Sequence, residues 1–437
     1  MSSLRVAFLV VLSGCYLSHE LEDPPVVVPP GVDGGPGVVP PSECPSALRL
    51  GAPSPMAGYC PTLANRSEWE APATQPELAW ELELPEEADR FAHLVVGREG
   101  RIYVRSSSRI FAVDDRGGRA RLRWVKEFDG VPSSPVLLAD GSIFVTVRMG
   151  LDGSQGLWLD DGGDIERRAP LPEGVGAPPI VGESGRFYFR VPTGEDFQSV
   201  LVAWSPTEER ELWRTRAIPS SFPKVALGPG DALYVLDPLL AADGRVPRIT
   251  RFDGATGEAM WSTIVGAPEE PINRGPAVGP DGAVHLVAWT ERTTVSTLVS
   301  LEPNGDERLR MALPTEPWGG GVAALTIGGD GRLFVKEGEK LMGIEPDGTV
   351  AWERRAHPNI AAGETVDAAG RLLAGSGGSS AIDGATGEEL WVSDIPAVRE
   401  MTPGGGVSIS FPGPPTLGDG VIYYMASDRI LQSAAAP

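Results

Sequence analysis

The sequence predicts an all-β protein, an eight-bladed β-propeller of four-stranded antiparallel blades. Three markers recur along residues 77–437: a Trp that opens a strand, a Gly-containing turn before an alternating strand, and a short strand that ends in an acidic turn. Four short strands per 40–50 residues are typical of one propeller blade. The 55 Gly and 42 Pro among 437 residues suit many short strands joined by turns.

The first marker is the Trp. Six copies are separated by 44, 89, 48, 91 and 39 residues: Trp80, Trp124, Trp213, Trp261, Trp352 and Trp391. Each of the two doubled gaps predicts a degenerate copy, one near Glu166 and one near Arg308. Six intact and two degenerate copies predict eight repeats with a period of about 44 residues.

The second marker is a turn, most often Asp-Gly, followed by β-branched and aromatic residues. This combination predicts a hairpin. Eight copies begin at Glu99, Asp140, Ser184, Gly230, Asp281, Asp330, Ala369 and Asp419. The third marker, for example residues 111–114 and 342–345, lies between the other two, so each repeat has strands A, B, C and D, with Trp on D.

The order of the markers predicts how the ring closes. The first D strand, residues 78–84, precedes every A–B hairpin, and the last A–B–C unit, about residues 415–432, has no D strand after it. The two parts together complete one blade. The N-terminal strand is therefore expected to pair with the C-terminal blade and to remove a free sheet edge.

The segment before the propeller indicates export. Residues 1–14 hold Arg5 and a short apolar run, as in a signal peptide, and Leu12-Ser13-Gly14-Cys15 resembles a bacterial lipobox with Cys15 as the lipidated residue. Residues 15–43 are rich in Pro and Gly, which predicts a disordered tether. Residues 44–76 are expected to form an irregular segment pinned by a disulfide between Cys44 and Cys60.

The hairpin at residues 381–391, with its close copy at 252–261, resembles the tryptophan-docking repeat of quinoprotein-type (PQQ-like) propellers. The resemblance covers about residues 77–432 and implies that each D-strand Trp packs against the turn of the neighbouring blade. The family includes quinone-dependent dehydrogenases and non-enzymatic propellers, among them an envelope lipoprotein of outer-membrane β-barrel assembly. The lipobox, the tether and eight blades resemble the non-enzymatic group more closely.

The resemblance implies that a dehydrogenase would hold its quinone beside two adjacent cysteines, with calcium and an acidic base in the axial channel. No two cysteines are adjacent here, and none lies inside the propeller. The four histidines show no paired metal-ligand spacing, and His285, at a B-strand position that is aromatic in other repeats, is expected to pack in the core. We therefore expect no catalytic residue, no metal and no cofactor.

One asymmetry predicts a binding face. The B–C loops of repeats three to five and the D–A loops beside them are long, and they share one face of the ring. Apolar groups lie in or near them at Phe197, Leu239, Leu240, Trp289 and Trp318. Such groups suit protein recognition; the alternative is that they fold back over the blades.

These features lead to an expected function, a membrane-anchored, non-enzymatic propeller that binds an envelope protein or polymer. The formal net charge of −22 disfavours nucleic acid and anionic lipid headgroups, so membrane attachment is expected through the N-terminal lipid alone. We expect a monomer in the bacterial envelope, on the outer membrane. The alternatives are a quinone-dependent oxidoreductase and a sensor that binds a small ligand or glycan in the axial channel.

Overall fold

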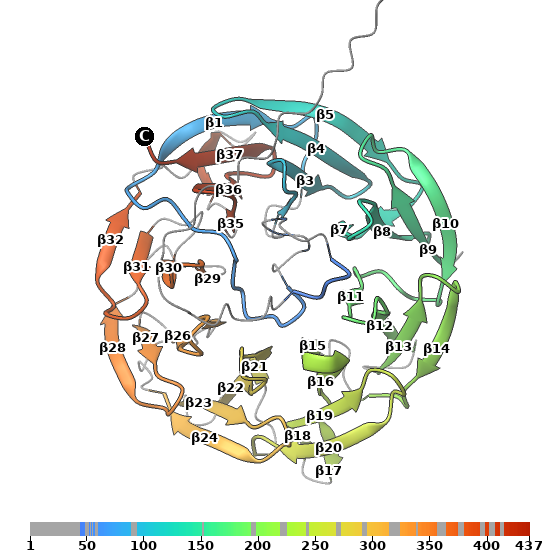
Figure 1. Cartoon of the computed structure of the whole chain (residues 1–437), viewed down its shortest axis with the longest axis vertical. Coiled ribbons are helices and arrows are strands. Elements are labelled where there is room, and N and C mark those ends of the chain that lie inside the picture. The colour runs from blue at the N-terminus through green and yellow to red at the C-terminus, as the bar shows by residue number, and fades with distance from the viewer. Residues whose placement is uncertain are drawn as a thin grey trace, which may run out of the picture. The chain divides into compact units, whose positions relative to one another are not determined.

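The computed structural model describes most of the chain from residue 44 onward. The described residues are 44–48, 52, 54, 56, 60–88, 94–150, 153–193, 198–218, 225–241, 244–267, 272–290, 295–313, 324–337, 340–355, 364–374, 380–393, 398–401, 407–410 and 415–437. All of them belong to one compact unit, Pro40–Pro437. Within this unit, antiparallel sheets follow one another around a ring (Figure 1), and the predicted eight-bladed propeller is confirmed.

The first three blades follow one another along the chain, and their strands run from A at the axis to D at the rim. Blade 1 contains β2 (Val95–Val96), β3 (Arg101–Arg105), β4 (Arg109–Asp115) and β5 (Ala120–Glu127). Blade 2 contains β6 (Val131–Pro132), β7 (Val136–Leu137), β8 (Ile143–Arg148), β9 (Ser154–Leu159) and β10 (Ile165–Leu171), and β6 and β7 both pair with β8. Blade 3 contains β11 (Ile180–Val181), β12 (Phe187–Pro192), β13 (Ser199–Ser205) and β14 (Arg210–Arg214).

Blades 4 and 5 have the same order of strands. Blade 4 contains β15 (Val225–Gly228), the short 3₁₀ turn η1 (Pro229–Asp231), β16 (Ala232–Leu236), β19 (Arg248–Asp253) and β20 (Ala259–Ile264). A separate hairpin, β17 (Leu239–Ala241) and β18 (Gly244–Val246), lies in its B–C connection. Blade 5 contains β21 (Ile272–Val278), β22 (Val284–Thr290), β23 (Val295–Leu301) and β24 (Glu307–Ala312).

The last three blades complete the ring. Blade 6 contains β25 (Ala324–Ile327), β26 (Leu333–Glu337), β27 (Lys340–Ile344) and β28 (Val350–Arg355). Blade 7 contains β29 (Thr365–Val366), β30 (Arg371–Ala374), β31 (Ser380–Asp383) and β32 (Glu389–Val392), and a hairpin of β33 (Val398–Met401) and β34 (Val407–Ser410) follows it. Blade 8 contains β35 (Thr416–Leu417), β36 (Val421–Met425), β37 (Ile430–Ala435) and, as its D strand, β1 (Glu77–Glu83).

Strand β1 closes the ring as predicted. It pairs antiparallel with β37, from Glu77 opposite Ala435 to Glu83 opposite Ile430. The chain thus joins its N-terminal strand to its C-terminal blade, and no blade is left with only three strands among those described. This pairing removes a sheet edge that would otherwise remain open.

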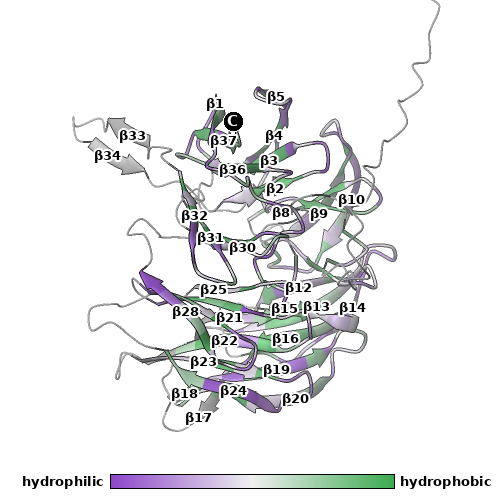
Figure 2. Cartoon of the chain, turned by 60° about the vertical axis from the view of Figure 1, so that its left-hand side comes forward, coloured by the Kyte–Doolittle hydropathy of each residue, from purple (hydrophilic) through white to green (hydrophobic). Residues whose placement is uncertain are grey.

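The hydrophobic core lies between neighbouring blades. The inner and middle strands are buried almost throughout, for example β13 over its whole length, whereas outer strands such as β5 alternate between partly buried and exposed residues. Figure 2 shows this difference in hydropathy between the mainly hydrophobic β16 and the hydrophilic stretches of β24 and β28. The predicted A–B turns are confirmed as well, because all eight contain a Gly with φ between 66° and 92°, a conformation that disfavours other residues.

Candidate interaction surface and axial strap

The Trp residues of the outer strands join the blades. Trp124, Trp213, Trp261 and Trp352 each donate Nε1–H to a carbonyl oxygen in the C–D turn of the next blade, at 2.9–3.0 Å. The accepting residues are Asp161, Gly254, Pro303 and Gly384, respectively. In these four cases the indole therefore both fills space between two blades and satisfies a carbonyl of the neighbouring turn.

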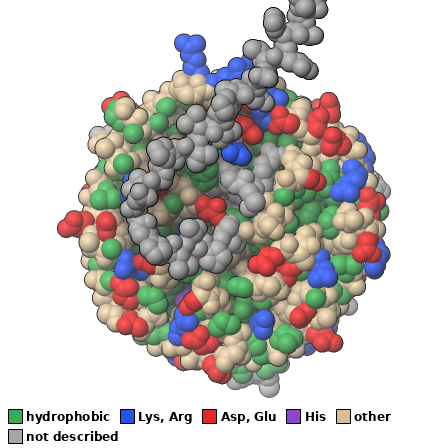
Figure 3. Space-filling model, in the orientation of Figure 1, with side chains coloured by type: hydrophobic (Ala, Val, Ile, Leu, Met, Phe, Trp, Pro, Cys, Tyr) green, Lys and Arg blue, Asp and Glu red, His purple; other side chains and the backbone are tan. Residues whose placement is uncertain are grey.

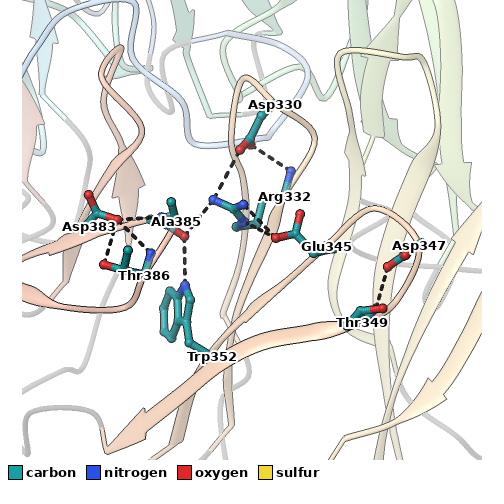
Figure 4. A network of polar contacts seen from close by, with 10 residues as sticks. Asp330, Arg332, Glu345, Asp347, Thr349, Trp352, Asp383, Ala385 and Thr386 are labelled. Atoms are coloured by element: carbon teal, nitrogen blue, oxygen red, sulfur yellow. Dashed lines mark hydrogen bonds and ion pairs between the residues drawn. The ribbon is translucent and has the colours of Figure 1, made fainter.

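Figure 4 shows this contact between blades 6 and 7. Trp352 and Arg332 both donate to the carbonyl of Gly384, at 2.9 and 3.0 Å. The turn is shaped by Asp383, whose Oδ1 accepts the backbone N–H groups of Ala385 and Thr386. The hydrogen bond from the Thr386 N–H is the main cause that lowers the pKa of Asp383, so this carboxylate stays ionised and keeps the turn in the shape that receives Trp352.

The two degenerate copies occupy the Trp position with other residues. The strand registers place Arg167 and Leu309 there, one residue beyond the predicted Glu166 and Arg308. Arg167 lies over the ring of Trp158 at 3.6 Å and donates to the carbonyl of Pro206 in the next blade. Leu309 instead contacts the turn of blade 6, where a Cβ on Gly348 would lie 2.5 Å from its Cδ1.

Trp80 and Trp391, at the two seams of the composite blade, depart from the pattern. Trp80 is 7 % exposed, and its Nε1 has no hydrogen-bond partner among the described residues. The seam between blades 8 and 1 is held instead by Tyr423, whose hydroxyl donates to Asp115 Oδ2 at 2.9 Å. In blade 8 the D strand is β1 and does not follow β37 through a C–D turn, so Trp391 meets the strap instead and donates to the carbonyl of Pro72 at 3.0 Å.

Pro72 belongs to a segment that lies across the axial channel, which we call the axial strap (the described residues among 44–72). Figure 1 shows its described part in blue across the middle of the ring. The predicted disulfide between Cys44 and Cys60 is present, with a Cα–Cα distance of 5.2 Å. The strap has backbone hydrogen bonds to seven of the eight blades, through Val96, Ala139, Leu227, Val278, Ile327, Val366 and Gly420. All of these residues lie at or beside an A–B turn, so the strap covers the inner strand edges at that end of the channel.

Asp367 and Arg371 hold the end of the strap and were missed from the sequence. Asp367 Oδ2 accepts the N–H of Ala71 at 2.9 Å and Arg371 Nε at 2.7 Å, and Arg371 Nη2 donates to the carbonyl of Ala71 at 2.7 Å. The Asp367 side chain is fully buried. A signal was present in the repeats, because the position of Asp367 holds Gly in six other blades: Gly97, Gly182, Gly228, Gly279, Gly328 and Gly418.

The predicted binding patch is described in part. Leu239 is 40 % exposed on β17, in the B–C connection of blade 4. Leu240 and Trp289 lie on β17 and β22, but their side chains are outside the described part of the structure, as are Phe197 and Trp318 entirely. The binding patch therefore stays a prediction. Cys15 and the tether also lie outside the described residues.

His285 packs in the core as predicted. It is 3 % exposed, and its Nδ1 lies 2.8 Å from the hydroxyl of Ser300 on the adjacent strand. Burial is the main cause that lowers its pKa to about 4, so the ring is neutral at pH 7. A neutral histidine beside a hydroxyl takes the place of the aromatic residue found at this position in other blades.

The described residues do not fit a bound quinone. The sole disulfide among them joins cysteines 16 positions apart, not adjacent ones, and no cluster of three His, Cys, Asp or Glu side chains suited to a metal ion occurs in this part of the chain. At the A–B end of the channel, backbone groups of the inner strands are bonded to the strap. Figure 3 shows acidic and basic side chains spread over one face of the molecule.

Comparison with known proteins supports the PQQ-like resemblance. A family model described as outer membrane protein assembly factor BamB matches residues 280–421. The fold resembles BamB from Moraxella catarrhalis (TM-score 0.53, 14 % identity, covering 83 % of this chain and 100 % of that one). It also resembles quinohemoprotein alcohol dehydrogenase from Comamonas testosteroni (TM-score 0.55, 14 % identity, covering 89 % of this chain and 81 % of that one). A third similar structure is Sqt1 from Saccharomyces cerevisiae (TM-score 0.52, 9 % identity, covering 83 % of this chain and 100 % of that one). No curated protein sequence matches the chain.

These likenesses show the fold and do not transfer an activity. The identities are 9–14 %, and the similar structures include both BamB and an alcohol dehydrogenase. The predicted resemblance to the PQQ-like propeller repeats is confirmed by the family model and by the eight four-stranded blades. Among the described residues, no helix has the length and apolar character needed to cross a membrane.

Proposed function

We propose that this chain is a lipid-anchored, non-enzymatic propeller that acts as a protein-interaction scaffold in the bacterial cell envelope. The observation that carries the proposal is the axial strap, whose backbone forms hydrogen bonds with the inner strand edges of seven blades. This arrangement favours a rigid platform over a cofactor site in the channel. The match of residues 280–421 to a family described as an outer membrane protein assembly factor supports an envelope protein as the partner.

The partner is proposed to bind the face that carries the B–C and D–A connections. The strap bonds at the opposite end of the inner strands, beside the A–B turns. Leu239, 40 % exposed on β17, supports the choice of the B–C face, since exposed apolar side chains are frequent in protein contacts. Trp318 is the proposed aromatic anchor.

Site-specific photo-crosslinking in living cells tests this proposal. A photoreactive residue in place of Leu239 or Trp318 should capture a discrete envelope protein, whereas the same residue in place of Gly117, in a C–D turn on the opposite face, should capture none. Trp318→Ala should reduce the amount of partner captured by the photoreactive residue at position 239 at least tenfold, while the melting temperature of the protein is unchanged. Equal capture from both faces, or a Trp318→Ala protein that melts much earlier, would contradict the proposed surface.

The alternative functions make opposite predictions for the purified protein. A quinone-dependent oxidoreductase should bind pyrroloquinoline quinone in the presence of calcium with one-to-one stoichiometry and should then oxidise an alcohol with a dye as acceptor. A sensor that binds a small ligand or glycan in the channel should keep the same affinity for that ligand when Leu239 or Trp318 is replaced. Either result would replace the scaffold proposal.

A further inference from the structure

The axial strap has two arms that meet at its disulfide. The described residues of the first arm are 44–48, 52, 54 and 56, and those of the second arm are 60–72. Cys60 is 6 % exposed and packs in a hydrophobic cluster with Leu417 and Trp391, in blades 7 and 8. Cys44 packs against that cluster and also against the cluster of Trp204 and its neighbours in blades 2 and 3. The disulfide therefore lies between opposite walls of the ring.

The first arm is bound to blades 1 and 2. The carbonyl of Ala47 accepts the N–H of Ala139 at 3.0 Å, and Leu48, 1 % exposed, packs in the cluster of blades 2 and 3. Ser54 exchanges two backbone hydrogen bonds with Val96, at 2.8 and 3.1 Å, and its side chain is fully buried. This arm is thus anchored on the wall across the channel from blades 4 to 7.

The second arm passes from blade to blade. Its carbonyls accept four equivalent amides, each of which directly precedes an A–B turn. The pairs are Leu227 with Pro61, Val278 with Thr62, Ile327 with Ala64, and Val366 with Asn65, at 3.0–3.1 Å. The arm ends at blades 7 and 8, where Asp367 and Arg371 hold Ala71 and where Trp391 donates to Pro72. Trp391 relies on this arm because blade 8 offers no C–D turn.

We propose that the Cys44–Cys60 pair is a redox lock on the strap. In the disulfide form Cys60, where the second arm begins, is linked to Cys44, which packs against blades 2 and 3, so the start of the second arm is held in place. In the dithiol form this link is lost, the second arm can detach from its strands, and the seam between blades 7 and 8 then loses the acceptor of Trp391. The ring thus closes fully only in an oxidising compartment, where disulfides persist.

The locking step is thiol–disulfide exchange. The thiolate of one cysteine attacks an incoming disulfide of a protein or small molecule, forms a mixed disulfide and releases one thiol. The second cysteine then displaces the remaining thiol and forms the Cys44–Cys60 bond. The pair loses two electrons and two protons, and the incoming disulfide is reduced to two thiols.

Amide hydrogen exchange tests the lock directly. The amides of Leu227, Val278, Ile327 and Val366 report the second arm, because each donates to it. Reduction of the purified protein under native conditions should accelerate exchange at these amides about 100-fold, the effect of losing a cross-link that closes a loop of about 15 residues. Amides of the middle strands β13 and β27 should exchange as before.

Variants separate the lock from general stability. Cys60→Ala should give the fast pattern without reductant, and adding reductant should have no further effect on it. Asp367→Asn should accelerate exchange near Ala71 and Ala368 while Leu227 and Val278 keep their slow exchange, since their part of the arm remains tied to Cys60. Unchanged exchange at the four amides on reduction, or an equal acceleration in β13 and β27, would overturn the proposal. These outcomes do not depend on any binding partner.

Discussion

At the scale of single residues, the inter-blade contact depends on two positions together. A Cβ on Gly257 would lie 2.6 Å from the ring of Trp213, and one on Gly387 would lie 2.6 Å from the ring of Trp352, so the indole needs a glycine beneath it. Where blade 2 has Arg167 in place of Trp, the facing turn has Glu209 with φ 53° in place of Gly, and the two charges lie 4.0 Å apart. At this contact both the Trp and the Gly are replaced, whereas Leu309 at the other degenerate copy still faces a glycine, Gly348.

Replacing Trp352 with Ala tests this contact. Trp352 is 9 % exposed and fills the space above Gly387, so the truncation should leave a cavity and lower the free energy of unfolding by about 3–5 kcal/mol. Leu390→Ala is the matched control, because Leu390 is 44 % exposed on the adjacent blade and should cost less than about 1 kcal/mol. Chemical denaturation followed by circular dichroism measures both, and equal losses would show that the docking contact is not special.

His285 gives a prediction for the dependence of stability on pH. Its pKa is about 4 in the fold and about 6.5 when unfolded, so its contribution is fully present above pH 6.5 and is lost as the pH falls toward 4. In the His285→Gln variant the amide can still form a hydrogen bond with Ser300, but it has no proton to gain in this pH range. Between pH 7 and pH 4.5 the wild type should lose roughly 2 kcal/mol more than the variant. The charged side chains that interact electrostatically with His285 are Asp281, Glu302 and Arg308. They are present in both proteins, so their own titration does not distinguish the two.

At the scale of elements, the N-terminal strand should decide whether the ring is closed. Trp80 and Leu84 are 7 % and 1 % exposed in a cluster shared by blades 8 and 1, and β1 supplies the fourth strand of blade 8. Deleting residues 77–84 should expose the edge of β37 and cause aggregation or loss of cooperative unfolding. Thermal unfolding with light scattering measures this, and Leu78→Ala, at a 47 % exposed site of the same strand, is the control. A deletion variant with unchanged melting would mean that β1 does not close the ring.

The elements that repeat could be predicted from the sequence, and those that occur once could not. Turn residues and strand periodicity identified eight A–B hairpins, because Gly at positive φ and alternating apolar residues leave a local pattern. The two degenerate D strands were predicted near Glu166 and Arg308, and the residues at the Trp position are their neighbours Arg167 and Leu309. The strap was predicted only as an irregular segment, since its order comes from backbone contacts with residues far along the chain, which leave no period in the sequence.

At the scale of the whole molecule, closure uses more than strand pairing. The ring is held at one seam by β1 and Tyr423, and at the other by Trp391 on the strap. Strand β1 and the strap residue Pro72 both lie within residues 60–84, so the part of the chain that precedes the repeats contributes to both seams. An anchor upstream of this part would leave the propeller attached through its own closing segment.

The anchor gives the last prediction. Cys15 is the proposed lipidated residue, because Leu12-Ser13-Gly14-Cys15 resembles a lipobox and small residues precede the cysteine at the spacing that the peptidase requires. Cys15→Ser should abolish labelling with palmitate, leave the precursor uncleaved by the lipoprotein peptidase and shift the protein out of the outer-membrane fraction. Cys44→Ser is the matched control for the loss of a thiol, and it should still be labelled. Equal labelling of Cys15→Ser and wild type would contradict the lipid anchor.

Tyr16 follows the lipidated residue and is not the Asp that retains many lipoproteins in the inner membrane. Tyr16→Asp should therefore move the labelled protein from the outer to the inner membrane fraction.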